Sequence, residues 1–210
     1  MDIAIRGLRS TTMILAATLL AGCAFGTRHP TLIYPPAVEP SAITAVQAAA
    51  KPAPKNTQII LSEFSDQRSD KNVVGTMRNG FGMRTADVIP TNSVPDWMMQ
   101  AMRIELQNDG YAVQTESTGG DRPTGASAVV SGQILNVFCD MYMSYSAQVS
   151  LLARLTRDGK ELLNKQYQGE GSAGIAWAGT AESYAQSLAL ALASAVKQFV
   201  AELDKGLAVP

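Results

Sequence analysis

A short apolar run near the N-terminus decides whether this chain crosses a membrane or loses its first segment. Residues 13–21 are apolar except for Thr18, and Arg6 and Arg9 precede them. A helix needs about 20 apolar residues to cross the hydrocarbon core of a bilayer, so this run is too short. A basic start, a short apolar core and small residues after it are typical of a secretory signal peptide. The sequence therefore predicts that residues 1–22 are a cleaved signal.

The four residues around the predicted cut carry a more specific pattern. Leu20-Ala21-Gly22-Cys23 resembles the lipobox of bacterial lipoproteins, in which a branched residue and two small residues precede a cysteine. The resemblance implies that Cys23 becomes the N-terminus and is acylated on its sulfur and its amino group. The alternative is an ordinary signal peptide with an incidental cysteine. Ala24 follows Cys23. Lipoproteins with aspartate at that position resemble those retained at the inner membrane. Because this chain has alanine there, we expect an outer-membrane lipoprotein that faces the periplasm.

Charge and histidine content exclude several classes of function. Without residues 1–22 the chain has 15 basic and 17 acidic residues, a net charge of −2. This balance offers no broad basic surface for the many phosphate contacts that nucleic-acid binding needs. The single histidine, His29, lies six residues after Cys23. A Ser-His-Asp triad, a Cys-His pair or a histidine-based metal site is therefore not expected in the folded part. Carboxylate pairs and Ser-Lys arrangements stay open as catalytic options, but no specific motif supports them, so we expect no enzymatic activity, metal or cofactor and no nucleic-acid partner.

Proline separates a tether from a folded domain. Residues 24–56 hold six of the ten prolines. Proline lacks an N–H donor and has a fixed φ, so a packed helix or a central strand is not expected there. We predict a signal at 1–22, a lipidated cysteine with a Pro/Ala-rich tether at 23–56, and one domain at 57–210. The stretch 31–34 is β-prone and is the one part of the tether that is suited to dock on the domain as an edge strand.

Hydrophobic periodicity within 57–210 predicts strands and two helices. Strands are expected over 58–64, 111–115, 128–139, 147–155 and 161–169, with a further hairpin near 73–83. The Asp158-Gly159 pair is a strong hairpin signal between the last two strands. Helices are expected over 95–108, with a cap near Ser93, and from Thr180 to about 205. The predicted fold class is α+β, a mainly antiparallel or mixed sheet of four to six strands with two helices packed on one face.

Dense charge follows the first predicted strand. The charged residues are Asp66, Arg68, Asp70, Lys71, Arg78 and Arg84. Loops on a rigid scaffold often carry function, which makes Asp66, Arg68, Arg78 and Asn79 a candidate partner-binding loop. The alternative, which the sequence favours, is that these charges pair with one another and close Asx turns that order the loop.

A methionine- and tyrosine-rich stretch is a second candidate site. Met141, Tyr142, Met143 and Tyr145 are suited to line an apolar groove, because methionine adapts to irregular ligands. The same side chains also fill cores between sheets and helices, which is the commoner use. Cys139, just before them, has no cysteine left to pair with once Cys23 is acylated, so we expect a buried free thiol.

Residues 169–174 match the pattern G-x-G-x-x-G. A dinucleotide site needs that turn to open a helix directly within a βαβ unit. Here the preceding strand closes a hairpin and residues 175–179 intervene before the helix. The pattern is therefore interpreted as a flexible connection between a strand and a helix.

Several short motifs together resemble the YajG-like envelope lipoproteins. They are Phe64-x-Asp66-x-Arg68, Val74-Gly75, Arg78-Asn79, Gly82, Trp97, Glu105-Leu106, Gly110-Tyr111-x-Val113, Gly132-x-Ile134, Gly159-Lys160 and Tyr167-x-Gly169. The resemblance covers nearly the whole chain after Cys23 and implies a lipid-anchored periplasmic α+β domain. The family has no established enzymatic activity to carry over. The longer proline-rich tether is where this sequence departs from it.

The leading functional hypothesis is a non-catalytic envelope lipoprotein, anchored in the membrane through Cys23, that binds an envelope protein or the cell wall. A second hypothesis is an auxiliary subunit of a lipid transporter that holds an acyl chain near 141–145. A third is a carboxylate-based cell-wall hydrolase, because carboxylate pairs do not need histidine. No specific motif supports the third.

Overall fold

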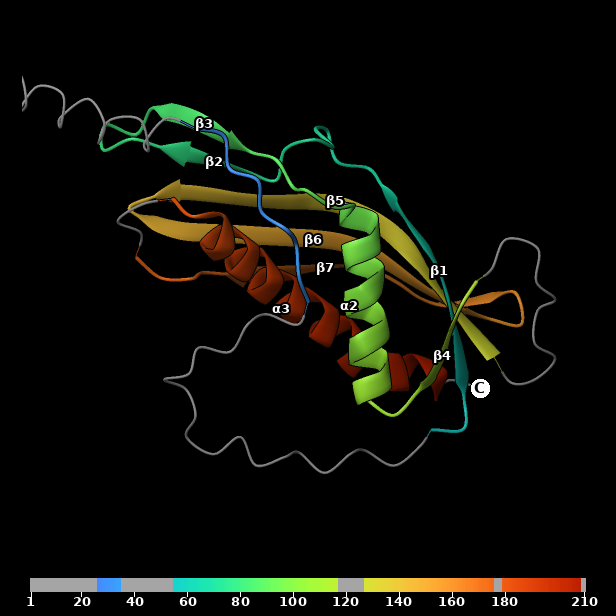
Figure 1. Cartoon of the computed structure of the whole chain (residues 1–210). Coiled ribbons are helices and arrows are strands. Elements are labelled where there is room, and N and C mark those ends of the chain that lie inside the picture. The colour runs from blue at the N-terminus through green and yellow to red at the C-terminus, as the bar shows by residue number, and fades with distance from the viewer. Residues whose placement is uncertain (1–25, 35–54, 117–126, 176–178, 209–210) are drawn as a thin grey trace, which may run out of the picture.

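Three long antiparallel strands form the body of the sheet (Figure 1). The structure is a computed structural model that describes residues 26–34, 55–116, 127–175 and 179–208. Strands β5 (Ser127–Tyr142), β6 (Ser144–Arg157) and β7 (Lys160–Gly171) follow one another in sequence and pair as neighbours. The turn between β6 and β7 has φ of 52° at Asp158 and 78° at Gly159, the left-handed pair that an Asp-Gly hairpin predicts.

The free edge of β5 carries two shorter strands in series. Strand β1 (Gln58–Asp66) runs parallel to the first half of β5, and β2 (Gly75–Arg78) runs parallel to its last residues. Strand β4 (Ala112–Thr115) adds to β1 in parallel, and β3 (Arg84–Val88) adds to β2 in antiparallel. The described residues thus form one mixed sheet of seven strands.

The fold class is the predicted α+β, but the sheet is larger than the four to six strands expected. The difference lies in β2 and β3, which the sequence indicated only as a hairpin within a loop. Both are short and largely polar, so they lack the apolar alternation by which strands are recognised. Pairing with β5, rather than their own sequence, makes β2 and β3 part of the sheet.

Both helices cover the same face of the sheet (Figure 1). Helix α2 (Val94–Asn108) contacts β1 and β4, and α3 (Ala181–Leu207) contacts β5, β6 and β7. Each begins at its predicted cap. The Ser93 hydroxyl accepts from the Asp96 N–H at 3.2 Å, and the Thr180 hydroxyl accepts from the Ser183 N–H at 3.2 Å. The apolar faces of both helices are buried against the sheet, as their periodicity predicts.

Glycines in β7 let α3 lie unusually close to the sheet. A Cβ atom added at Gly169 would be 2.0 Å from the Ala191 carbonyl oxygen, and one at Gly171 would be 2.3 Å from the Ser187 carbonyl oxygen. No side chain fits at such distances. The first two glycines of the G-x-G-x-x-G pattern therefore serve helix–sheet packing, whereas Gly174 lies after β7 with a positive φ of 89° and no atom within 4 Å of an added Cβ.

Part of the predicted tether lies on the domain. Arg28 forms a parallel bridge with Val88, and the side-chain amide of Asn92 bonds both backbone groups of Leu32, at 2.8 and 3.0 Å. Leu32 and Tyr34 are each 2% exposed. The stretch 31–34 therefore docks on the domain, but it does so as an irregular segment bonded to the Asn92 side chain and not as the edge strand that the sequence suggested.

No helix within the described ranges is long and apolar enough to cross a membrane.

Candidate functional site

The charged loop is an excursion between two strands that share one edge of β5. Asp66 pairs with Ile134 at the end of β1, and Gly75 pairs with Cys139 at the start of β2. The chain therefore takes nine residue steps to pass five steps of β5, and the surplus forms a loop. On its return it passes so close to β5 that a Cβ at Gly75 would lie 2.3 Å from the Cys139 carbonyl oxygen.

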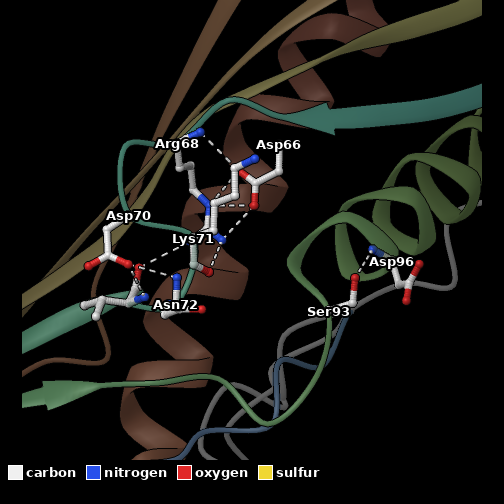
Figure 2. Close-up of polar contacts among 8 residues, drawn as sticks. Asp66, Arg68, Asp70, Lys71, Asn72, Ser93 and Asp96 are labelled. Atoms are coloured by element: carbon white, nitrogen blue, oxygen red, sulfur yellow. Dashed lines mark hydrogen bonds and ion pairs between the residues drawn. The ribbon is translucent and has the colours of Figure 1, made fainter.

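Arg68 holds this loop together (Figure 2). Its guanidinium donates from Nε to Asp66 Oδ1 at 3.0 Å and from Nη2 to Asp66 Oδ2 at 2.9 Å. It also donates to the Lys71 carbonyl at 2.7 Å and to the Val73 carbonyl at 3.3 Å. The residue is 6% exposed. Planar bidentate pairing of this kind is the strongest ion-pair geometry that arginine forms.

Asp66 is held in its charged form. Burial of the carboxyl acts to raise its pKa, but the hydrogen bonds from the side chain and the backbone N–H of Arg68 outweigh burial and lower the pKa of Asp66. The Asp66–Arg68 pair therefore supports the loop from within, which is the alternative that the sequence favoured.

The rest of the loop folds around Asp70. Its Oδ1 accepts from the Asn72 N–H at 2.9 Å and the Val73 N–H at 3.2 Å, which makes an Asx turn. Lys71 and Asn72 consequently stand on the outside of the turn with exposed side chains. Among the exposed residues of this loop, Lys71 and Asn72 also line the cleft described next.

A shallow cleft of about 300 Å³ separates this loop from the segment that leads into α2. One wall is formed by Asp66, Arg68, Lys71 and Asn72, and the other by residues 89–95. Figure 2 shows the loop and the N-terminus of α2, marked by Ser93, on the two sides. The cleft combines an ammonium group, amide groups and hydroxyl groups, so it is suited to bind polar groups with hydrogen-bond acceptors.

The other two residues of the predicted loop lie at a different place. Arg78 donates to both oxygens of Asp140 on β5 at 2.9 Å, and the pair is about one-third exposed. The side-chain oxygen of Asn79 accepts from the Phe81 and Met83 N–H groups, each at 3.0 Å, and closes the β2–β3 turn. Neither residue lines the cleft. The structure therefore brings Asp66 and Arg68 together but separates them from Arg78 and Asn79.

Two of the four candidate groove residues lie in the core and two are exposed. Met141 and Tyr145 are buried, and the Tyr145 hydroxyl accepts from the Thr180 N–H at 2.9 Å. Tyr142 and Met143 are exposed on the other side of the β5–β6 hairpin, with φ of 64° at Met143. Alternation along β5 places Tyr142 on the face opposite to Met141, and Met143 is exposed because it forms the turn between β5 and β6.

Cys139 is a buried free thiol, as predicted. Burial raises its pKa to about 12, so the thiol is uncharged at neutral pH and weakly nucleophilic. Cys23, the predicted lipidation site, lies outside the described residues.

Residues 89–95 were missed as a wall of the site. Ser93 and Pro95 were recognised from the sequence only as the start of a helix. Nothing local in this segment indicates that it faces the loop at 66–72, because the two are joined through the pairing of β2, β3 and β5.

Comparisons with known proteins support the fold. No protein-family model and no curated protein matches this sequence. A solved structure from Xanthomonas campestris, described by the family DUF330, has 12% identity and a TM-score of 0.52, and the match covers 87% of this chain and 95% of that one. At this identity the likeness establishes a shared fold alone.

Two further solved structures are more distant. One is a hypothetical protein from Chlamydia trachomatis, with 11% identity, a TM-score of 0.48, and coverage of 72% of this chain and 98% of that one. The other is a lipoprotein from Neisseria meningitidis, with 18% identity, a TM-score of 0.35, and coverage of 56% and 84%. Both likenesses are too weak to say anything about this chain, and the resemblance to YajG-like lipoproteins remains a prediction.

Proposed function

We propose that this chain is a lipid-anchored, non-catalytic binding protein of the cell envelope, held at the outer membrane and facing the periplasm. The observation that carries the proposal is the Leu20-Ala21-Gly22-Cys23 motif after a short apolar run that cannot span a bilayer. The resemblance to YajG-like envelope lipoproteins supports the same assignment.

A binding role, rather than catalysis, is supported by how the reactive groups are used. The Cys139 thiol is buried and keeps its proton, and the carboxylate of Asp66 is bound by the guanidinium of Arg68. These groups serve the fold. The exposed groups beside them, on Lys71 and Asn72, are suited to donate hydrogen bonds to a partner.

We place the partner-binding surface at the cleft between the loop and residues 89–95. The partner is an envelope protein or a cell-wall peptide, since both present carbonyl and carboxylate acceptors to such donors. The transporter hypothesis has less support, because Met141 and Tyr145 are already packed in the core and leave only Tyr142 and Met143 for an acyl chain.

The anchor is tested by metabolic labelling. Radiolabelled palmitate should enter the wild-type chain, and Cys23→Ala should lose both the label and fractionation with membranes. A Cys23→Ala chain that is still labelled and still sediments with membranes would refute the anchor.

The binding surface is tested by crosslinking in intact cells. A photo-crosslinking amino acid at Lys71 should capture a specific partner, which is then identified by mass spectrometry. The matched control is the same substitution at Lys197, an exposed lysine on α3. Equal capture from both positions, or none from Lys71, would contradict the assignment.

A further inference from the structure

Large apolar side chains gather in exposed positions at one end of the sheet. Phe81 is 89% exposed and Ile175 is 79% exposed. Met83, Tyr142 and Met143 are also exposed. Water around such groups costs free energy, so a cluster of them indicates a surface that another phase or molecule covers.

These five residues belong to one surface, here named the apolar tip. They come from the β2–β3 turn, from the end of β5 and the β5–β6 turn, and from the segment after β7. The Tyr142 hydroxyl donates to the Gly80 carbonyl at 3.4 Å, which joins the first two, and Ser144 bridges Ile175, which joins the third. Figure 1 shows both turns at the left end of the sheet.

The N-terminal segment approaches from this same end. The Arg28 N–H donates to the Asp87 carbonyl at 3.0 Å, and the Arg28 carbonyl accepts from the Ile89 N–H at 2.9 Å. The bridge is parallel, so residues before Arg28 lie toward the start of β3, where the β2–β3 turn is. In Figure 1 the blue segment accordingly begins beside β3.

Very little chain remains between this point and the predicted anchor. Cys23 precedes Gly26, the first described residue, by three positions. Three residues span at most about 11 Å. An acyl group on Cys23 therefore brings a membrane surface close to the apolar tip, and residues 35–54 add no reach because residues 26–34 are already docked.

We infer that the apolar tip inserts into the membrane interface beside the acylated Cys23. The inference rests on the proposed lipid anchor and adds an orientation to it, with the long strands pointing at the membrane. Phenylalanine, tyrosine and methionine suit this interface, where one side is apolar and the other is wet. The nearby charges are paired, Arg78 with Asp140 and Arg84 with Asp87, so burial of apolar groups, not attraction to anionic lipids, holds the tip.

The test places a nitroxide label at the tip of the acylated full-length chain. The labelled variant is Phe81→Cys, and the matched control is Gln107→Cys, an exposed position near the end of α2, at the opposite end of the sheet. Cys139 is buried and Cys23 is taken by the lipid, so the introduced thiol receives the label. The chain is reconstituted into vesicles of phosphatidylethanolamine and phosphatidylglycerol, and collisions with oxygen and with a water-soluble nickel chelate are measured.

We expect the label at residue 81 to collide more with oxygen and less with nickel than the label at residue 107. Nickel collisions that match the control would overturn the inference. Shielding of residue 81 from both reagents would also overturn it, because a protein then covers the tip. Flotation of the vesicles separates the two proposals. If the vesicles float and the chain does not float with them, the anchor is refuted and the tip contact with it. If the chain floats with the vesicles but the label at residue 81 is exposed to water, the tip contact alone is refuted.

Discussion

At the scale of single residues, two arginines that look alike in the sequence have different roles. Arg68 is buried and makes five side-chain hydrogen bonds within its loop, whereas Arg78 makes an ion pair with Asp140 that is about one-third exposed. Removing one partner of a buried pair leaves an uncompensated charge and costs about 3–5 kcal/mol, against about 0–1 for an exposed pair. The difference is a matter of burial, not of residue type.

We therefore expect Arg68→Ala to lower the Tm by on the order of 10 °C and Arg78→Ala to lower it by no more than about 4 °C. Thermal unfolding followed by circular dichroism measures both.

The pH dependence of the Tm is a second readout. The pKa of Asp66 is lowered in the folded state, so the stability from the pair is present above the unfolded pKa of about 3.9 and is lost as pH falls through the folded value. The Tm difference between wild type and Arg68→Ala should shrink in that acidic range. Equal Tm values for the wild type and Arg68→Ala at neutral pH would contradict a structural role of Arg68 and would favour a role of the loop in recognition.

At the scale of elements, the contact between β7 and α3 depends on two missing side chains. Gly169 and Gly171 lie under backbone atoms of α3, and the helix presents small residues such as Ser187 and Ala191 at the contact. Helix α3 cannot move away without exposing apolar partners such as Leu188 and Leu192. The close approach is therefore a property of the pair of elements.

We expect Gly171→Ala to destabilise the protein by about 1–3 kcal/mol, because the added methyl group forces the helix and the strand apart. Gly80→Ala is the control, since nothing lies within 4 Å of a Cβ at that position. Urea unfolding of the two variants gives the comparison. If both variants unfold at the same urea concentration, the close packing of α3 on β7 is wrong.

At the scale of the whole molecule, the N-terminal segment is part of the domain although its composition resembles a linker. Leu32 and Tyr34 are buried, and the Tyr34 hydroxyl donates to Glu105 on α2. Because only three positions separate Cys23 from Gly26, the docking sets how far the domain would stand from the proposed anchor on Cys23. The proposed anchor implies a short distance between the domain and the membrane.

Adjacent leucine and isoleucine residues test the docking. Leu32 is 2% exposed and Ile33 is 62% exposed. We expect Leu32→Ala to cost about 2–5 kcal/mol through the cavity it leaves, and Ile33→Ala to cost less than about 0.5. Thermal melts of the full chain measure the two costs. A docked segment is inconsistent with two equally harmless substitutions.

Local signals in the sequence predicted most elements of the fold. Ser93 and Thr180 start the helices, Asp158-Gly159 makes the hairpin, and alternating apolar residues mark β6, because capping, turn geometry and side-chain periodicity each depend on a few neighbouring residues. Of the candidate site, the sequence identified Asp66 and Arg68 and the alternative that they pair. Two residues of opposite charge so close in a loop can form an ion pair wherever the loop lies.

Only the tertiary structure decided which segments meet. The parallel placement of β1 and β2 on one edge of β5, the wall at residues 89–95, the docking of Leu32 and the apolar tip all join parts of the chain that are far apart in sequence. Such pairings are set by how much apolar surface the complete fold buries. Short polar strands such as β2 and β3 have no sequence pattern that identifies the strand with which they pair. The same holds for Met141 and Tyr142, whose placement in the core or in water was decided by the face of β5 that α3 covers.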